Sequence, residues 1–223
     1  MADTAFTEDE IKVIAAQLRK PEGEMGEEIA RRMNDGNRAM NLHTLAVLDP
    51  QPNDAILEIG MGNGHFVRNI VRLDASIRYV GGDYSADMVA MAAGENTAVG
   101  VRGQVQFIHA DARALPMGDE AFNKVFTVNT FYFWDDHVAV LEELRRVLKP
   151  SGMLILAVRP RQNMLQFPVT KYGFAMWDND TILDFLQTHG FTIMGTTYIR
   201  EPDQIGHPMA AEREALIVTA KKI

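Results

Sequence analysis

Acidic and glycine residues recur in this sequence at a spacing that can bind a nucleotide-like ligand. The short apolar run 55–57 is followed by Glu58, and glycines then stand at alternate positions, Gly60, Gly62 and Gly64. An apolar run beside turn formers predicts a strand buried on both faces, and glycines allow a ligand to approach the backbone closely. Apolar residues at helical spacing between 66 and 71 predict a helix after the turn. The stretch therefore predicts a strand, a nucleotide-binding turn, and a helix whose N-terminal N–H groups face the ligand.

The spacing of the glycines disfavours a nicotinamide dinucleotide as that ligand. A dinucleotide fingerprint reads G-x-G-x-x-G/A, and its third small residue lets helix and strand pack closely. Here the position three after Gly62 is His65, which is too large for that packing. A nicotinamide-dependent oxidoreductase stays as an alternative, although Glu58 and His65 both argue against it.

The Glu58-x-Gly60-x-Gly62-x-Gly64 motif resembles the first motif of the class I S-adenosylmethionine-dependent methyltransferases, E/D-x-G-x-G-x-G. Further segments match that family in the same order. They are Asp83, Asp111-Ala112, Leu115-Pro116 and Lys149-Pro150. The ending Leu-x-x-Val-Leu-Lys-Pro-x-Gly at 144–152 is typical of the branch that includes the quinone-biosynthesis C-methyltransferases, with Ser151 in place of a usual glycine. The match is strong over about residues 55–160.

The resemblance implies S-adenosylmethionine as cofactor, and a carboxylate with neutral backbone suits its zwitterionic methionine end better than an anion-binding nest. Asp83 ends the second expected strand, about 20 residues after the glycine turn, where this fold places the acid that binds the ribose hydroxyls. We expect Asp83 to serve the ligand and not the fold. Asp111 and Ala112 are implied to face the adenine, with a solvent-facing loop acid as the alternative for Asp111. The implied cofactor contacts are Glu58, Gly60, Gly62, Gly64, Asp83, Tyr84, Met88, Asp111, Ala112 and Asn129.

Aromatic residues follow the fourth expected strand, at the sheet edge where open α/β sheets bind ligands. The predicted wall of the site for the methyl acceptor is therefore the run Phe131, Tyr132, Phe133 and Trp134. Residues 159–177 form an irregular insertion of a length that is usually functional or mobile. Its aromatic side chains favour a lid over an apolar or aromatic small molecule, with a dimer surface as the alternative. The insertion contributes Phe167, Tyr172, Phe174 and Trp177 to the predicted acceptor site.

No dedicated catalytic residue is obligatory, because methyl transfer from a sulfonium is downhill and the protein mainly aligns the acceptor and excludes water. If a base takes part, His137 is the first candidate. It falls in the first turn of an expected helix, where the helix dipole disfavours imidazolium; an exposed first-turn histidine is the alternative. Tyr132 is the second catalytic candidate. Besides a small-molecule methyltransferase and an oxidoreductase, a catalytically silent S-adenosylmethionine-binding protein remains open.

The elements that must position these residues alternate between strands and helices. Strands are expected at 55–59, 77–83, 105–109, 124–129, 153–158, 191–199 and 214–221. The predicted fold class is α/β, a Rossmann-like seven-stranded sheet that is mostly parallel, with an antiparallel last strand and helices on both faces. Helices before the first strand, one of them capped by Thr7 with Glu10, are expected to cover the ligand. Asp135 is expected to cap the helix after the fourth strand. A single domain, 1–223, thus comprises a helical cap at 1–50 and a core at 51–223 with the lid at 159–177.

Composition limits the other classes of function. The chain has 223 residues, no cysteine, and a formal net charge of −8 with scattered lysines and arginines. Neither a metal site nor a nucleic-acid footprint is therefore predicted. No apolar run approaches the ~20 residues of a membrane span, and no signal-peptide pattern is seen, so a cytoplasmic location is expected. The expected partners are a small-molecule methyl acceptor and, where the insertion is an interface, a second copy of the chain in a homodimer.

Overall fold

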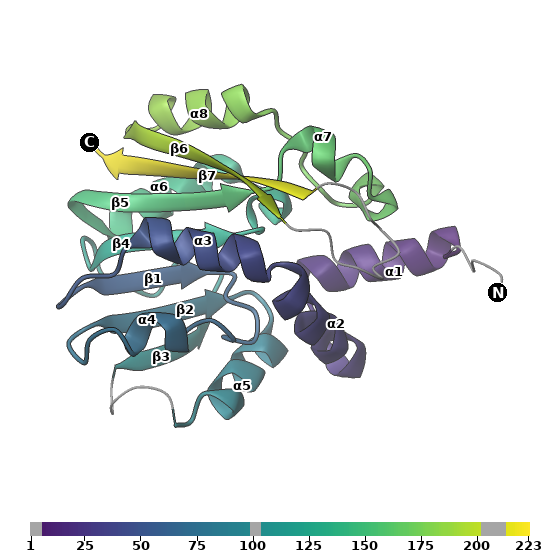
Figure 1. The fold of residues 1–223 in the computed structure, drawn as a ribbon, viewed down its shortest axis with the longest axis horizontal. Helices are drawn as coiled ribbons and strands as arrows, with labels where there is room; N and C mark the ends of the chain where they lie inside the picture. The colour runs from purple at the N-terminus through teal and green to yellow at the C-terminus, as the bar shows by residue number, and fades with distance from the viewer. Residues whose placement is uncertain (1–5, 99–103, 202–212) are drawn as a thin grey trace.

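The structure is a computed structural model, and it describes residues 6–98, 104–201 and 213–223. In this part of the chain, seven strands form one sheet with the order β3-β2-β1-β4-β5-β7-β6 (Figure 1). The strands are β1 (Ala55–Ile59), β2 (Arg78–Asp83), β3 (Val105–His109), β4 (Phe122–Val128), β5 (Leu148–Val158), β6 (Phe191–Glu201) and β7 (Arg213–Lys222). β7 runs antiparallel to both of its neighbours, and the other pairings are parallel. The predicted fold class is confirmed.

The strand order reverses beside β1, and this reversal places the site. β1 lies between β2 and β4, with Glu58 next to Gly81 of β2 and Phe126 of β4. Every residue of β1 is buried, as expected for a central strand that is covered on both faces. In an open sheet, ligands bind at the carboxyl ends of the strands beside the point of reversal. The motif residues that follow β1 therefore lie at that crevice.

Helices cover both faces of the sheet, and the described residues form a core cluster on each face. On one face, α3 (Arg38–Leu48) and α4 (Arg68–Val71) pack with strand residues such as Ile56 and Phe126. On the other face, α6 (His137–Val147) and α8 (Asn179–Thr188) pack with residues such as Leu57 and Val125. Neighbouring strand residues enter different clusters because successive side chains of a strand point to opposite faces. α5 (Ala86–Glu95) packs beside β2 and β3.

The chain before β1 forms a helical cap at the carboxyl ends of the parallel strands. α1 (Glu8–Arg19) and α2 (Gly23–Gly36) lie beyond the arrowheads of those strands (Figure 1). α1 begins with the predicted capping box, in which the Thr7 side chain accepts the Glu10 N–H and the Glu10 carboxylate accepts the Thr7 N–H at 2.7 Å. Asn37 separates α2 from α3. Among the described residues, none of the helices combines the length and the apolar character that a membrane crossing requires.

Two local expectations around helix starts are corrected. The helix after the glycine turn is α4, which has four residues, and turns fill residues 65–67 before it. A turn follows it, in which the Asp74 carboxylate accepts the Ser76 N–H at 2.8 Å. Asp136, and not Asp135, caps α6 by accepting a backbone N–H at 3.0 Å. Asp135 instead pairs with Arg19 of α1 at 2.5 Å, so it joins the cap to the sheet edge.

The segment after β5 has more regular structure than its sequence predicts. It holds α7 (Arg161–Met164) and the 3-10 helix η2 (Pro168–Lys171), and η2 packs against α1. β5 itself begins earlier than expected, at Leu148, and includes Ser151 in the left-handed backbone region at a φ of 61°. Glycine adopts this conformation without strain, which accounts for the usual glycine at this position of the motif. The sequence also predicts a loop at 202–209 between the last two strands, and that stretch lies outside the described residues.

Candidate active site

A cavity opens at the carboxyl edge of the sheet, between the glycine turn and the helical cap. Its volume is about 200 Å³, and residues of α1, α2, α3 and the ends of β1, β2 and β4 line it. Among the residues singled out from the sequence, the lining includes Glu58, Gly60, Gly62, Asp83, Tyr84, Met88, Asp111, Ala112, Asn129 and Trp134. The fold therefore brings nearly all of the implied cofactor contacts together.

Glu58 is a buried acid near the end of β1 that faces this cavity. Its carboxylate accepts a hydrogen bond from the Tyr79 hydroxyl of β2. Burial raises the pKa of Glu58 from 4.5 to about 7; the Tyr79 hydrogen bond opposes this rise, and the nearby Asp83 adds to it. A cation bound beside Glu58 would therefore favour its carboxylate form near neutral pH.

Asp83 holds the glycine turn to the end of β2. Its two carboxylate oxygens accept the Gly62 N–H at 2.9 Å and the Ser85 N–H at 2.9 Å. Burial raises the pKa of Asp83 from 3.8 to about 6, and these hydrogen bonds oppose the rise. A carboxylate oxygen can accept more than one hydrogen bond, so ligand hydroxyls can still bind here. The expectation that Asp83 serves only the ligand is wrong, because it also bonds two backbone segments of the protein.

The N–H groups of the three motif glycines bond within the protein. Gly60 donates to a carbonyl of β2 at 2.8 Å, and Gly64 donates to the carbonyl of Met61 at 3.1 Å. Gly62 donates to the Asp83 carboxylate at 2.9 Å. The sequence predicts N–H groups at a helix N-terminus that face the ligand, and this is wrong for the three glycines. Turns at residues 65–67 separate the glycines from the first residue of α4.

Gly62 and Gly64 have different surroundings. Gly62 has a φ of 58°, and no described atom lies within 4 Å of the position that a β-carbon would take. Its bare backbone faces the cavity. A β-carbon on Gly64 would lie 3.1 Å from the Ala92 side chain and 3.1 Å from the Phe107 ring. The described lining does not include Gly64. Gly64 instead lets the turn pack closely against α5 and β3. The implied contact of Gly64 with the cofactor is therefore corrected.

The end of the cavity implied to hold adenine is formed by β2, α5 and the segment after β3. Met88 is fully buried, whereas Tyr84 is exposed. The Asp111 carboxylate accepts from the Arg113 guanidinium, with Nε–Oδ1 at 3.0 Å and Nη2–Oδ2 at 2.6 Å, and this pairing lowers the pKa of Asp111. Asp111 and Ala112 both line the cavity. Their contact with an adenine ring stays a prediction.

The chemistry of these residues fits S-adenosylmethionine. Glu58 offers a carboxylate to an ammonium group, and Asp83 offers acceptor oxygens to ribose hydroxyls. Open space at Gly62 admits a ligand up to the backbone. A pyrophosphate is disfavoured, because it needs free N–H donors at the turn and the glycine N–H groups are already bonded. In the described part of the chain, no group of three potential metal ligands comes together.

Only some residues of the predicted aromatic wall line the cavity. Trp134 lines the cavity, together with Phe133 of the same aromatic run. Phe131 and Tyr132 are at most 5% exposed and belong to the core cluster under α6 and α8. They lie in this core because η1 (Phe131–Phe133), a single 3-10 turn, points successive rings in different directions. Within the aromatic run, Phe133 and Trp134 therefore face the cavity while Phe131 and Tyr132 do not, and contact with an acceptor stays a prediction.

The aromatic residues of the insertion support this wall from behind. Phe174 packs on Phe133 with ring centres 4.7 Å apart. Trp177 and Phe167 pack against the core cluster under α6 and α8. The Tyr172 hydroxyl donates to a carboxylate of α1 at 3.0 Å. The described lining of the cavity includes none of these four insertion residues, which corrects their predicted contact with the acceptor in this conformation.

The two catalytic candidates also lie behind the wall. The His137 ring donates through Nε2 to the Phe131 carbonyl at 2.9 Å and stacks on Trp177 with ring centres 4.5 Å apart. Burial lowers the pKa of His137. The Tyr132 hydroxyl accepts the Arg159 N–H, and burial raises the Tyr132 pKa. The described cavity lining includes neither side chain. Neither side chain faces this cavity, and a catalytic role for His137 or Tyr132 stays a prediction.

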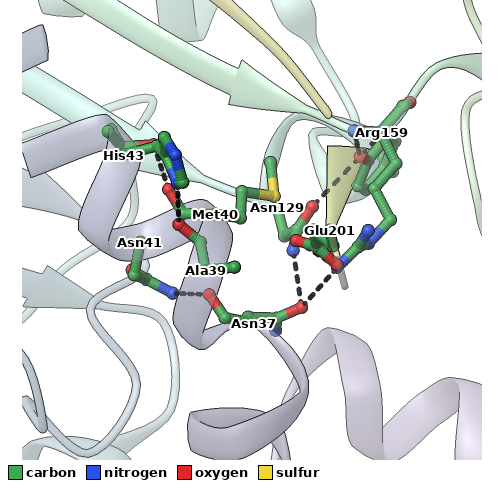
Figure 2. Close-up of polar contacts among 10 residues, drawn as sticks. Asn37, Ala39, Met40, Asn41, His43, Asn129, Arg159 and Glu201 are labelled. Carbon is green, nitrogen blue, oxygen red and sulfur yellow. Dashed lines mark hydrogen bonds and ion pairs between the residues drawn. The ribbon is translucent and has the colours of Figure 1, made fainter. Parts of the chain in front are cut away.

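The helical cap adds residues to the site that sequence reasoning missed. Asn34 and Asn37 line the cavity beside Asn41. Asn34 lies in the last turn of α2, Asn37 between the two helices and Asn41 in α3, so the break between the helices brings them together and no single helix period in the sequence signals it. Asn37 also contacts Asn129 after β4, as Figure 2 shows.

Comparison with known proteins agrees with this site. A methyltransferase domain model matches residues 57–156. The uncharacterized methyltransferase YdaC of Bacillus subtilis (strain 168) is 28% identical over 126 residues, which are 56% of this chain and 67% of that protein. A demethylmenaquinone methyltransferase of Thermus thermophilus is 34% identical over 105 residues, which are 47% of each chain. The match thus spans about half the length of the Thermus protein.

A solved structure shares the whole fold. It is a putative methyltransferase in complex with the Haloferax volcanii Trm112 methyltransferase activator, and it matches with a TM-score of 0.77 at 20% identity over 97% of this chain and 99% of that chain. The order of the strands, the acids at the ends of β1 and β2 and the matched domain all lead to one family. The methyltransferase domain matched at 57–156 and the named relatives support a class I S-adenosylmethionine-dependent methyltransferase of the type 11 branch, with S-adenosylmethionine as its cofactor.

Proposed function

We propose that the protein transfers the methyl group of S-adenosylmethionine to a small molecule with an apolar or aromatic part. The observation that carries the proposal is a single cavity with Glu58 and Asp83 at its cofactor end and an aromatic wall of Phe133 and Trp134. Such rings bind apolar surface and exclude water. The relative named demethylmenaquinone methyltransferase supports a small-molecule acceptor.

The proposed reaction asks mainly for alignment. Bound S-adenosylmethionine supplies an electrophilic methyl group on a sulfonium. A nucleophilic atom of the acceptor bonds to the methyl carbon as the carbon–sulfur bond breaks, and the electron pair of that bond stays on sulfur. Glu58 and Asp83 hold the cofactor end, while Phe133 and Trp134 hold the acceptor in line and keep water out. An acceptor that binds as a phenolate or carboxylate, or an amine that becomes an alkylammonium, needs no base from the chain, which agrees with the place of His137 behind the wall.

A methyl-transfer screen tests the proposal. Formation of S-adenosylhomocysteine is measured with and without each member of a panel of quinols, phenols, amines and carboxylic acids, and mass spectrometry identifies the methylated product. Acceptor-dependent formation of both products supports the proposal. A protein that binds S-adenosylhomocysteine but methylates no member of a broad panel would favour the alternative, a catalytically silent S-adenosylmethionine-binding protein.

Some expectations about the whole protein accompany this proposal. They are a single domain with a cap at 1–50 and a core at 51–223, a lid at 159–177, a homodimer and a cytoplasmic location. Light scattering of the purified protein measures its oligomeric state. Hydrogen exchange of the insertion with and without acceptor measures whether it closes over the site.

Binding of S-adenosylhomocysteine is expected to weaken as the pH falls from about 8 to about 6. The pKa of Glu58 is raised to about 7, so its carboxylate is progressively protonated over this range. Because the carboxylate form attracts the ligand ammonium, the affinity should fall roughly tenfold. Titration calorimetry at several pH values measures this. Glu58→Gln removes the titrating group, so its affinity should be lower than that of the wild type at high pH and nearly independent of pH.

The stability of the ligand-free protein is expected to change with the opposite sign. The folded-state pKa values of Glu58 and Asp83 lie above the ordinary values of 4.5 and 3.8. The folded state therefore binds more protons than the unfolded state between about pH 4 and pH 7, and stability is lost as the pH rises through this window.

For the binding prediction, an affinity for S-adenosylhomocysteine that does not depend on pH would contradict the ionisation of Glu58 as the source of ligand binding.

Phe133→Ala is expected to lower turnover of the acceptor while the cofactor end stays intact. Loss of the phenyl surface should reduce kcat/KM for an acceptor found in the screen about tenfold, with the Kd of S-adenosylhomocysteine within about threefold of wild type. Steady-state kinetics and calorimetry measure the two values. Tyr172→Phe is the control, because its hydroxyl bonds α1 outside the cavity. Equal losses of cofactor and acceptor affinity would mean that Phe133 supports the fold instead of the acceptor.

A further inference from the structure

We propose that Tyr79, a buried residue of β2 outside the glycine motif, is a positioning residue for cofactor binding, because its hydroxyl holds one oxygen of Glu58 and leaves the other oxygen to the ligand ammonium. The inference rests on the proposed function only through the cofactor. It concerns a side chain that the described lining of the cavity does not include. Tyr79 therefore acts on the ligand through Glu58 and not by direct contact.

The register of the sheet brings Tyr79 to Glu58 along a diagonal. In the pairing of β1 with β2, Ile56 lies opposite Tyr79, and Glu58 lies opposite Gly81. Tyr79 and Gly81 are two residues apart, so they share one face of the sheet. A diagonal neighbour on the next strand is within reach of a long aromatic side chain. The Tyr79 side chain thus passes over Gly81 and donates its O–H to Glu58 Oε2.

Gly81 leaves open the space that this hydroxyl occupies. A β-carbon at Gly81 would lie 2.9 Å from the Tyr79 hydroxyl oxygen and 2.3 Å from Met61 Sδ, and neither separation is tolerated between atoms that are not bonded. The Tyr79 ring also packs edge-on against Phe107 of β3, with ring centres 6.2 Å apart. Close packing of this kind fixes the ring and keeps the hydroxyl on Glu58.

Both partners of the hydrogen bond are removed from water. Tyr79 is 1% exposed and Glu58 is 6% exposed. Burial raises the pKa of Tyr79 well above its ordinary value, so the phenol keeps its proton and can donate at every pH near neutrality. Glu58 Oε1 has no hydrogen-bond partner among the described residues, and Glu58 lines the cavity. One carboxylate oxygen is thus bonded within the sheet, and the other is left for a ligand.

The surroundings of Glu58 give the Tyr79 bond a large share in its ionisation. Burial raises the pKa of Glu58 to about 7 against the Tyr79 hydrogen bond, and the Asp83 charge adds to the rise. β4 and α3 bring the apolar Phe126 and Met40 to this face of the sheet. The further ionisable residues that line the cavity are Tyr84 and two ion pairs, Arg19 with Asp135 and Arg113 with Asp111. Charge is compensated within each pair, so Tyr79 is the group that favours the carboxylate form of Glu58.

The hydrogen bond has two consequences for the ligand. Bonding of Oε2 restricts rotation of the carboxylate, which lowers the entropy lost when an ammonium binds. The same bond increases the fraction of the empty site that is already ionised near neutral pH. A ligand that needs the carboxylate binds more weakly in proportion as that fraction falls. Loss of the hydroxyl should therefore weaken binding most strongly at low pH.

Calorimetry on Tyr79→Phe tests the assignment, because this change removes the hydroxyl and keeps the ring. S-adenosylhomocysteine is titrated between about pH 6 and about pH 8.5, the range that spans the ionisation of Glu58. The control ligand is 5′-methylthioadenosine, which lacks the amino-acid group. Tyr172→Phe is the control variant, since it removes another phenol–carboxylate bond, at 3.0 Å, outside the described cavity lining. Glu58→Gln, alone and combined with Tyr79→Phe, shows whether the hydroxyl acts through the carboxylate.

The expected result is a loss that depends on both pH and ligand. Near pH 7, Tyr79→Phe should bind S-adenosylhomocysteine about tenfold more weakly than wild type, and the loss should shrink towards about pH 8.5. The midpoint of the pH dependence should move up by about one unit. Binding of 5′-methylthioadenosine to Tyr79→Phe, and of both ligands to Tyr172→Phe, should stay within about twofold of wild type. In the Glu58→Gln background, Tyr79→Phe should cost less than about twofold.

Three results would overturn the assignment and make Tyr79 a packing residue. They are an unmoved midpoint, equal losses for the two ligands, or the full loss in the Glu58→Gln background. NMR of ligand-free protein with isotope-labelled glutamate carboxyl carbons is the second measurement. The Glu58 resonance, identified by its absence from Glu58→Gln, should titrate at a higher pH in Tyr79→Phe, and an unchanged titration would also overturn the assignment. None of these measurements uses an acceptor, so a negative methyl-transfer screen would count against the proposed function and leave this inference standing.

Discussion

Asp83→Ala is expected to weaken binding of S-adenosylhomocysteine by more than about a hundredfold and to lower the thermal midpoint of the ligand-free protein. The ligand loses two charge-assisted hydrogen bonds to its ribose, each of which contributes about 1.5–3 kcal/mol. The protein loses the acceptor of the Gly62 and Ser85 N–H groups. An N–H left unpaired costs about 1–3 kcal/mol, so the turn should become less stable as well.

Calorimetry and thermal unfolding of the same preparation measure both effects. Asp111→Ala is the comparison, because Asp111 also lines the cavity but its carboxylate is bound by Arg113. We expect that variant to lose less than about fivefold in affinity, since its charge is already compensated. A wild-type affinity in a folded Asp83→Ala protein would remove Asp83 from the ribose site, and an unchanged midpoint would show that the Gly62 and Ser85 N–H groups find other partners.

Gly60→Ala is expected to destabilise the fold by about 3 kcal/mol, through overpacking and a strained backbone. Gly60 has a φ of 72°, and a β-carbon there would lie 2.1 Å from Thr130 Cγ2. Thr130 is not free to rotate away, because its hydroxyl is hydrogen-bonded to that of Thr127, which in turn donates to the carbonyl of Ile59 at 2.8 Å. The methyl group and Thr130 therefore compete for the same space at the ends of β1 and β4.

Gly62→Ala is the matched substitution in the same turn, and it is expected to act on the ligand. Its backbone is also left-handed, at a φ of 58°, but the added methyl group meets no described atom within 4 Å. The fold should lose only about 1 kcal/mol from the backbone conformation. The methyl group enters the cavity, so the affinity for S-adenosylhomocysteine should fall more than about tenfold.

Chemical denaturation and calorimetry of the two alanine variants separate these effects. Gly60→Ala combined with Thr130→Ala should recover part of the lost stability, because the clashing Cγ2 is removed while the strained φ remains. Similar stabilities for the two single variants would contradict the packing role of Gly60. A Gly62→Ala protein that binds ligand as tightly as wild type would contradict the approach of the cofactor to the turn.

The fold and the cofactor end of the site were predictable because short-range signals encode them. An apolar run followed by glycines marks β1, and the interval from that turn to the acid at the end of the next strand marks Asp83. The capping box of Thr7 and Glu10 spans only four residues. In each case, the interacting groups lie close in the chain or at a distance that the fold class itself dictates.

The acceptor end was predicted less well because residue type does not tell which way a side chain points. Phe131, Tyr132 and Phe133 are consecutive aromatics in one 3-10 turn, and the first two enter the core while the third reaches the cavity. His137 has the right chemistry for a base, but stacking on Trp177, forty residues further along, holds it behind the wall. Packing across elements decides such directions, and no periodicity in the sequence records them.

By itself the sequence determined the fold class, because motif spacing and hydrophobic pattern are properties of neighbouring residues, and through the resemblance of its motifs it implied the cofactor. Only the tertiary structure decided which polar side chains bond one another inside the protein. Asn37 lies 92 residues from Asn129 and 122 residues from Arg159, and it meets them only where the α2–α3 junction packs on the ends of β4 and β5. The partners of a polar side chain depend on such long-range contacts, which the folded core creates.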